Sequence, residues 1–424
     1  MLILFSVFLG LILLSAPIGV AVIMSSLVAI ITTDTLSTSF IARTILTTFD
    51  SFPLLAVPLF MLAGEIMSRG GMSKRLFDFA NYFLGGFTGG VPMAVVFACL
   101  LFGALSGAGA ADTAAIGSLM IPAMVHMGYP AVFAATLVAA AGGLAVIMPP
   151  SLPMIMYGVS AQESIGDLFM AGIIPAIIIA AMLCVYCNIY CKRKNLTNKT
   201  LNIDIKKKSF GVVLKESFFA LLSPVIILGG IYGSIFTPTE AAGVIVGYSL
   251  IVSIFIYKSV SLKDLFPIFC SAGSSVGPVL IIMGGATVFT KVLNAMQIPQ
   301  MVANGILSIT TNAVLILIML NILLLIVGVF MDTLSSILIL TPILLPVANS
   351  IGMDQVHFGV MMVVNLAIGF ITPPMAVNLF VVSGISGLSI EKLSKGIIIP
   401  LLVLAAGLLL VTYIPALTLF LPNL

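Results

Sequence analysis

Two aspartates stand inside otherwise apolar stretches of this 424-residue chain and are the first candidates for chemistry. Asp112 lies in Ser106-Gly-Ala-Gly-Ala-Ala-Asp-Thr113, and Asp332 lies in Gly328-Val-Phe-Met-Asp-Thr333. A carboxylate at the centre of a membrane span costs about 2.5–3.5 kcal/mol on insertion scales and marks a functional site by default. The competing role is a helix N-cap, because each aspartate precedes a new helical arm. For Asp332 both roles stay open, whereas for Asp112 capping is favoured.

Glycine and hydroxyl residues near both aspartates are candidates for binding sodium (Na+). Unwound backbone carbonyls and Ser or Thr hydroxyls can coordinate this cation, and glycine permits the positive φ angles that turn carbonyls inward. The first candidate set comprises Ser106, Gly107, Gly109, Gly142, Gly143 and the carbonyls of Ile147 and Met148. The second set comprises Gly328, Met331, Thr333, Gly369 and Thr372. The alternative is that these glycines only allow close helix packing.

The double proline Pro149-Pro150 interrupts an apolar run and occurs again in the second half of the chain. Ile147-Met-Pro-Pro150 returns 224 residues later as Ile371-Thr-Pro-Pro374. Pro122 and Gly128 return at the same offset as Pro346 and Gly352, and Ala111-Asp112-Thr113 aligns with Met331-Asp332-Thr333 at an offset of 220. Paired interrupted segments in two halves indicate the substrate and ion site of a transporter. An anionic substrate would meet the amino-terminal end of a half-helix, such as the one that begins at Ser151.

Composition and periodicity predict an all-α polytopic membrane protein. The chain is 61% hydrophobic and 7% charged, with a mean hydropathy of +1.29, and its apolar runs leave room for about ten spans of roughly 20 residues. We expect two inverted repeats, each with a re-entrant helical hairpin and a broken helix. The first repeat is 1–191, with its hairpin at about 91–124 and its broken helix at about 131–160. A basic loop at 192–217 follows. The second repeat is 218–424, with its hairpin at about 313–348 and its broken helix at about 356–385.

Several segments outside these hairpins also carry predictions. The run Leu2 to Thr32 is interpreted as one retained span, because it has no basic region or cleavage site of a signal peptide. Met72 to Phe87 is amphipathic and fit to lie at the membrane interface, and Ser261 to Cys270 resembles it. Eight of the 17 Lys and Arg lie between Lys192 and Lys215, which places that loop in the cytoplasm. A nucleic-acid patch there is disfavoured. Near span ends, Lys291, Arg43, Glu65 and Glu240 are expected to snorkel or pair.

The segment Asp50-Ser-Phe-Pro-Leu-Leu-Ala-Val-Pro-Leu-Phe-Met-Leu-Ala-Gly64 resembles the signature of the large membrane subunit of TRAP (tripartite ATP-independent periplasmic) transporters. Further matches to that pattern are Ser106-Gly107, Gly117, Met120-Ile-Pro122, Pro149-Pro-Ser151, Tyr157-Gly158, Phe236-Thr-Pro-Thr-Glu-Ala-Ala242 and Gln297-Ile-Pro299. The chain departs from it at the first hairpin tip, where many members have further hydroxyl residues and this chain has Ala108, Ala110 and Asp112.

The resemblance implies a multi-pass protein of the bacterial inner membrane that works as a sodium-driven, elevator-type secondary transporter. It implies two partners, a small membrane subunit and a soluble periplasmic substrate-binding protein. The substrate would be a small organic acid, of the sialic acid or C4-dicarboxylate class. On this analogy Ser106, Ser151 and Asp332 face the substrate.

Two other classes of protein are alternatives. A stand-alone sodium–carboxylate symporter of the same architecture would transport without partner proteins. An intramembrane enzyme is disfavoured, because the chain has neither the His-Glu-x-x-His zinc pattern nor the Gly-x-Gly-Asp aspartyl motif. The chain also lacks the Gly-x4-Gly-Lys-Ser/Thr nucleotide-binding loop, so ATP is not expected to drive transport within it.

Overall fold

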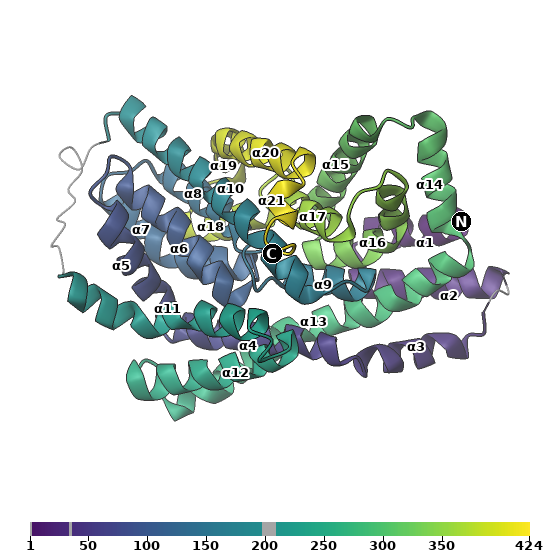
Figure 1. Ribbon diagram of the computed structural model, residues 1–424, viewed down its shortest axis with the longest axis horizontal. Helices are drawn as coiled ribbons and strands as arrows, with labels where there is room; N and C mark the ends of the chain where they lie inside the picture. Colours follow the sequence, from purple (N-terminus) through teal and green to yellow (C-terminus); the bar gives the residue numbers. More distant parts are fainter. Residues whose placement is uncertain (1, 34–35, 197–208) are drawn as a thin grey trace.

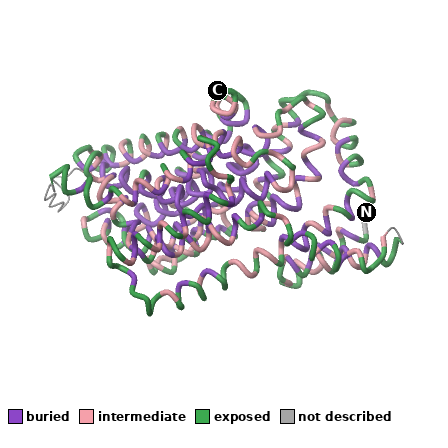
Figure 2. Tube along the Cα trace, turned by 60° about the horizontal axis from the view of Figure 1, so that its bottom comes forward, coloured by how far each residue is buried: buried purple, intermediate pink, exposed green. Residues whose placement is uncertain are grey.

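The computed structural model describes residues 2–33, 36–196 and 209–424, and every regular element in these ranges is a helix. The all-α prediction is therefore confirmed. Figure 1 shows two layers of helices, and Figure 2 shows that buried residues gather in the middle of the molecule. Most of residues 192–217, the expected basic loop, lies outside the described residues.

Two helical hairpins turn back in the interior of the fold. The first consists of α6 (Gly90–Ser106) and α7 (Ala110–His126), and the second of α15 (Ala313–Phe330) and α16 (Thr333–Ser350). The turns are short because the sequence supplies residues that end one helix and begin the next. Gly107 ends α6 in the left-handed conformation with a φ of 60°, which glycine adopts at little cost. Asp332 begins α16 as its N-cap.

Each double proline separates two half-helices. In the first half of the chain these are α8 (Ala131–Leu144) and α9 (Leu152–Ala161). In the second half they are α17 (Gln355–Gly369) and α18 (Val377–Ser386). Proline lacks a backbone donor and its ring clashes with the preceding turn, so neither helix continues through the pair.

The halves of the chain interlock through these elements. The half-helix α9 packs on hairpin arm α16, and the half-helix α18 packs on hairpin arm α7. The long helices α10 (Ile165–Arg193) and α20 (Ile398–Tyr413) pack on each other and on this group. We call α6–α10, α15–α18 and α20 the central bundle.

A second group of helices lies along one side of the central bundle (Figure 1). Its members are α1 (Leu2–Leu13), α2 (Ile18–Thr33), α3 (Ser39–Phe49), η1 (Phe52–Leu55), α4 (Ala56–Arg69), α11 (Phe210–Tyr232), α12 (Pro238–Ile251), η2 (Val252–Ile256) and α13 (Leu262–Ala295). We call this group the outer layer. It is held together by α13, which packs on α2, α3 and α4, and it meets the central bundle where α4 touches α6 and where α13 touches α16.

Two short amphipathic helices connect the layers. The first, α5 (Met72–Leu84), follows α4 and packs between α11 and α6. The second, α14 (Ile298–Ile309), follows α13 and packs between α13 and α16. The prediction that Ser261–Cys270 is the counterpart of α5 is therefore wrong. Those residues belong to α13, a single helix of 34 residues that accommodates Pro267 and Pro278.

The beginning of the chain also differs from the prediction. Leu2 to Thr32 is not one span, since α1 and α2 are separate helices that pack on each other. Ser15, at a φ of 61°, and Pro17 make the turn between them. The estimate of about ten spans is too high for the described residues. Seven helices there are long and apolar enough to cross a membrane, or eight if the bent pair α19 (Ile390–Gly396) and α20 is one span.

Candidate functional site

The first hairpin tip closes on itself through Asp112. The carboxylate of Asp112 accepts a hydrogen bond from the Ser106 hydroxyl and one of 3.3 Å from the Ala108 amide. Asp112 is fully buried, and Ser106 is 6% exposed. The favoured N-cap role of Asp112 is wrong, because Gly109 is the N-cap of α7 and Asp112 lies in its first turn. The Asp112 side chain is therefore held at the tip by the Ser106 hydroxyl and the Ala108 amide.

The glycines of the first tip let it approach the broken helix closely. A Cβ atom at Gly107 would lie 2.6 Å from the Pro150 carbonyl oxygen, closer than real Cβ contacts allow. Gly109, at a φ of 23°, faces Val146 and the ring of Phe370. Gly142 of α8 lies against the Thr113 hydroxyl, which a Cβ there would meet at 1.9 Å. The structure thus brings Ser106, Gly107, Gly109 and Gly142 into one neighbourhood.

Two members of the first sodium set, Gly143 and Ile147, contact other helices. A Cβ at Gly143 would lie 3.3 Å from the Ala367 carbonyl oxygen, so Gly143 marks where α8 crosses α17. The carbonyl oxygen of Ile147 lies against Gly172 of α10, 2.9 Å from where a Cβ would stand.

Ser151 holds the break of the first broken helix together. It is the N-cap of α9, fully buried, and its hydroxyl accepts a bond of 3.3 Å from the Met154 amide. The same hydroxyl donates to the Val146 carbonyl across the double proline. Both hydrogen-bonding roles of the Ser151 side chain are thus taken inside the chain.

The second hairpin tip is built differently from the first. Asp332 caps α16 by accepting a bond of 3.0 Å from the Ser335 amide, and it also accepts from the Ser335 hydroxyl. Because Asp332 is an N-cap and Asp112 is not, the two aspartates are not structural equivalents, and their alignment at an offset of 220 is wrong. The helix ends before the tips, Ser106 and Phe330, do keep the offset of 224 residues.

The second tip also approaches its broken helix through glycine. A Cβ at Gly369 would lie 2.5 Å from the Gly328 carbonyl oxygen, so α15 and α17 cross backbone to backbone. Met331 ends α15 as its C-cap. The hydroxyls of Thr333 and Ser336 are buried and have no hydrogen-bond partner among the residues that the structure describes. The Thr372 hydroxyl donates to the Ile368 carbonyl at 2.8 Å.

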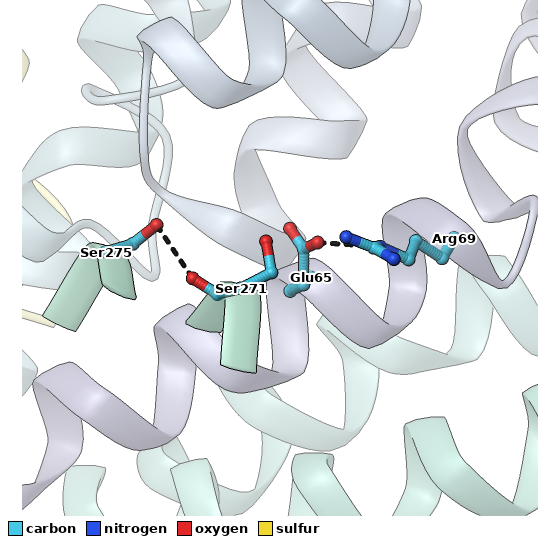
Figure 3. Close-up of polar contacts among 4 residues, drawn as sticks. All are labelled: Glu65, Arg69, Ser271 and Ser275. Atoms are coloured by element: carbon cyan, nitrogen blue, oxygen red, sulfur yellow. Dashed lines mark hydrogen bonds and ion pairs between the residues drawn. The ribbon is translucent and has the colours of Figure 1, made fainter. Parts of the chain in front are cut away.

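A cavity of about 360 Å³, which we call the tip cavity, separates the first tip from the outer layer. Its central-bundle wall includes Ser106, Ala108 and Asp112, and its outer wall includes Glu65 and Ser275. Figure 3 shows the outer wall, where the Glu65 carboxylate pairs with Arg69 of the same helix at 2.8 Å, and the Ser275 hydroxyl donates to the Ser271 carbonyl at 3.2 Å. The two layers touch beside this cavity, because a Cβ at Gly64 would lie 2.7 Å from Ser106 Cβ.

Four residues at these tips were missed by the sequence reasoning. Thr113 lies against Gly142, Gly64 lies against Ser106, and Ser335 and Ser336 follow the Asp332 cap. Hydroxyl residues directly after each tip are a signal that could have found three of them. No local signal marks Gly64, because its importance comes from a helix more than 40 residues away.

Comparisons with known proteins agree with this architecture. The family profile described as "Tripartite ATP-independent periplasmic transporter, DctM component" matches residues 5–417. The chain is 43% identical over 419 residues to the isethionate TRAP transporter permease protein DctMQ of Oleidesulfovibrio alaskensis, covering 99% of this chain and 66% of that longer protein. It is 40% identical over 376 residues to the C4-dicarboxylate TRAP transporter large permease protein DctM of Pseudomonas aeruginosa, covering 89% of this chain and 87% of that protein.

Two further similarities cover nearly the whole chain. It is 38% identical over 416 residues to the sialic acid TRAP transporter large permease protein SiaM of Vibrio cholerae, covering 98% of this chain and 97% of that one. The solved structure of the Alcanivorax borkumensis YdaH transporter, described as having an unusual topology, shares the fold at a TM-score of 0.65, with 14% identity and 89% of each chain covered. The chain therefore belongs to the DctM-component family of tripartite ATP-independent periplasmic transporters, as a multi-pass permease of the bacterial inner membrane and not an enzyme.

Proposed function

We propose that the chain carries a small organic acid into the cell by sodium-coupled secondary transport. In this proposal a soluble periplasmic binding protein delivers the substrate, and a small membrane subunit completes the permease. Family membership supports the tripartite organisation. The relatives named for isethionate, C4-dicarboxylate and sialic acid support the substrate class, since all three are small organic anions.

The observation that carries the proposal is the meeting of a hairpin tip and a broken helix in each half of the chain. Gly107 faces the break at Pro150, and Gly328 faces Gly369 just before the second break. Such breaks leave backbone carbonyls free in the membrane interior, where they can coordinate a cation. Buried hydroxyls without a partner are costly, and Thr333 and Ser336 are two such groups at the second tip. A sodium ion bound there would be coordinated by these two hydroxyls.

Movement between the layers is the second part of the proposal. The central bundle would move against the outer layer as an elevator, carrying the ions and the substrate together. The layers are separate groups of helices whose contact beside the tip cavity rests on Gly64 and Ser106. The amphipathic helices α5 and α14 would act as the connecting arms, because each packs on both layers.

Reconstitution into proteoliposomes tests this function. The chain alone, under an inward sodium gradient, should take up none of isethionate, succinate or sialic acid. Adding the small membrane subunit and the binding protein loaded with its ligand should give uptake that stops when potassium replaces sodium. A thermal-shift screen of the binding protein against these anions identifies the ligand to use. Strong uptake by the chain alone would favour the stand-alone symporter, and uptake without sodium would contradict the coupling.

A further inference from the structure

A second and larger cavity, of about 620 Å³, lies between the two layers. We call it the Lys291 cavity. Its outer wall comes from α3, η1 and α13, and its central-bundle wall comes from α16 and the end of α9. The polar residues that line it are Thr48, Ser51, Ser160, Gln162, Thr287, Thr290, Lys291, Asn294 and Asn349.

This cavity opens on the side of the membrane opposite the tip cavity. The basic residues Lys192 and Arg193 end α10 and place that end in the cytoplasm. Gln162, which lines the Lys291 cavity, lies just before the other end of α10, so this cavity faces the periplasm. Helix α13 lines both cavities, with Ser275 at the tip cavity and Lys291 sixteen residues further on. At a rise of 1.5 Å per residue these positions are about 24 Å apart.

The two cavities differ in the charged residues that line them. Lys291 is the sole charged residue in the described lining of the Lys291 cavity, whereas Asp112 and Glu65 are the charged residues in the described lining of the tip cavity. Within the described ranges no carboxylate pairs with the Lys291 ammonium, which lies 5.6 Å from the ring centroid of Phe40. Lys291 was expected to snorkel or pair near a span end. The structure places it on the wall of a cavity.

The side chains beside Lys291 on α13 are polar. Thr287, Lys291 and Asn294 share one face of α13, since residues three and four apart on a helix are neighbours. The hydroxyl of Thr287 already donates to the Met283 carbonyl at 3.0 Å. The Asn294 amide can donate into the cavity next to the ammonium, and an ammonium and an amide together suit a carboxylate or sulfonate group.

We propose that the Lys291 cavity is a receiving site for the substrate anion, held by the ammonium of Lys291 and the amide of Asn294. The anion occupies it after release from the binding protein and before transfer to the central bundle. This inference rests on the proposed function for the identity of the anion.

Thiol labelling tests the site on the isolated chain, without transport. The variant N349C, at another position in the cavity lining, is made in a C270S background, because Cys270 is the one cysteine that the structure shows as exposed. An anionic methanethiosulfonate reagent should label N349C several-fold faster than a cationic one, and adding K291Q should remove or reverse that preference. Isethionate or succinate should slow labelling, whereas glycerol should not. Equal rates for both reagents that K291Q does not change would overturn the proposal.

Uptake by the three-component system gives a second readout. K291Q should raise the half-saturation concentration for the loaded binding protein several-fold, K291E should raise it further, and the sodium dependence should stay unchanged. K263Q is the matched control, since Lys263 is an exposed lysine at the other end of the same helix. Loss of the small subunit from purified K291Q would show that Lys291 serves assembly and would overturn the proposal. If the wild-type system takes up no anion, the proposed function fails, while the labelling result still decides the nature of the cavity.

Discussion

Similar tripeptides at the two hairpin tips place their aspartates in different roles. Asp332 caps a helix through the Ser335 amide, a local role that the sequence left open beside substrate contact. Asp112 accepts from Ser106 and Ala108 across its own tip, and it also lines the tip cavity. The difference arises because Gly109 begins α7 three residues before Asp112, whereas Asp332 itself begins α16.

Asp332→Asn separates capping from substrate contact. Asparagine caps a helix about as well as aspartate, so the protein should keep its yield and thermal stability. If the charge of Asp332 acts on the substrate, the half-saturation concentration for substrate should change several-fold at an unchanged sodium dependence. Asp332→Ala is the comparison, since loss of the cap should cost about 1 kcal/mol of stability. Uptake by Asp332→Asn that matches wild type would leave Asp332 as a cap alone.

Thr372→Val tests the second sodium site. The substitution keeps the shape of the side chain and removes a hydroxyl that now donates to the Ile368 carbonyl at 2.8 Å. If this hydroxyl coordinates sodium, the sodium concentration for half-maximal uptake should rise several-fold, and uptake should recover at high sodium. Thr136→Val is the control, because the Thr136 hydroxyl also donates within its own helix, to Val132 at 2.8 Å, away from both tips. A sodium curve shifted equally in both variants would remove Thr372 from the site.

At the scale of elements, local chemistry decides what the sequence could predict. The bounds of the hairpins and broken helices lie within a few residues of the predicted ones, because Gly107 and Gly109 mark the first tip, Asp332 caps the second, and a double proline marks each break. Ser261 to Cys270 was predicted as a separate interfacial segment, because it resembles Met72 to Phe87, whereas Leu262–Ala295 is the single helix α13. Packing of α13 on α2, α3, α4, α14 and α16 keeps it continuous, and that packing is not a local property.

The contacts within the candidate site could not be predicted from local sequence either. Glycines at the tips were predicted from their spacing, but the groups that they face depend on the tertiary fold. Thr113 reaches Gly142, while the Ile147 carbonyl turns toward α10. These contacts join helices from different parts of the chain, so periodicity carries no signal for them.

Gly64→Ala probes the contact between the layers. The added Cβ would stand 2.7 Å from Ser106 Cβ, so the first tip could not keep its present place against α4. Uptake should fall severalfold. Expression should hold, because alanine favours a helix interior over glycine by roughly 0.5–1 kcal/mol. Gly243→Ala is the matched control, since a Cβ on that glycine of α12 meets no atom within 4 Å. Equal uptake by both variants would show that the Gly64 contact does not limit transport.

At the scale of the whole molecule, the positions of the two cavities indicate the direction in which one layer would slide against the other. Both lie between the outer layer and the central bundle, about 24 Å apart along α13. Helix α13 is the wall common to both, while the facing walls come from different elements, α7 and its tip at one end and α9 with α16 at the other. A bundle that slides along α13 would therefore enlarge one cavity as it closes the other.

Crosslinking across the tip cavity tests this sliding. Ala108 of the first tip and Ser275 of α13 face the same cavity from opposite layers, so A108C and S275C in a C270S background can be joined by a bifunctional thiol reagent. Uptake by the three-component system should fall to near zero on crosslinking and return when a reducible linker is cleaved. The control pair I45C and G284C joins two outer helices, where a Cβ on Gly284 would lie 3.2 Å from Ile45 Cγ2, and its crosslink should leave uptake intact. Because a linker between layers blocks sliding whereas one within a layer does not, undiminished uptake by the linked A108C/S275C protein would rule out an elevator movement at this boundary.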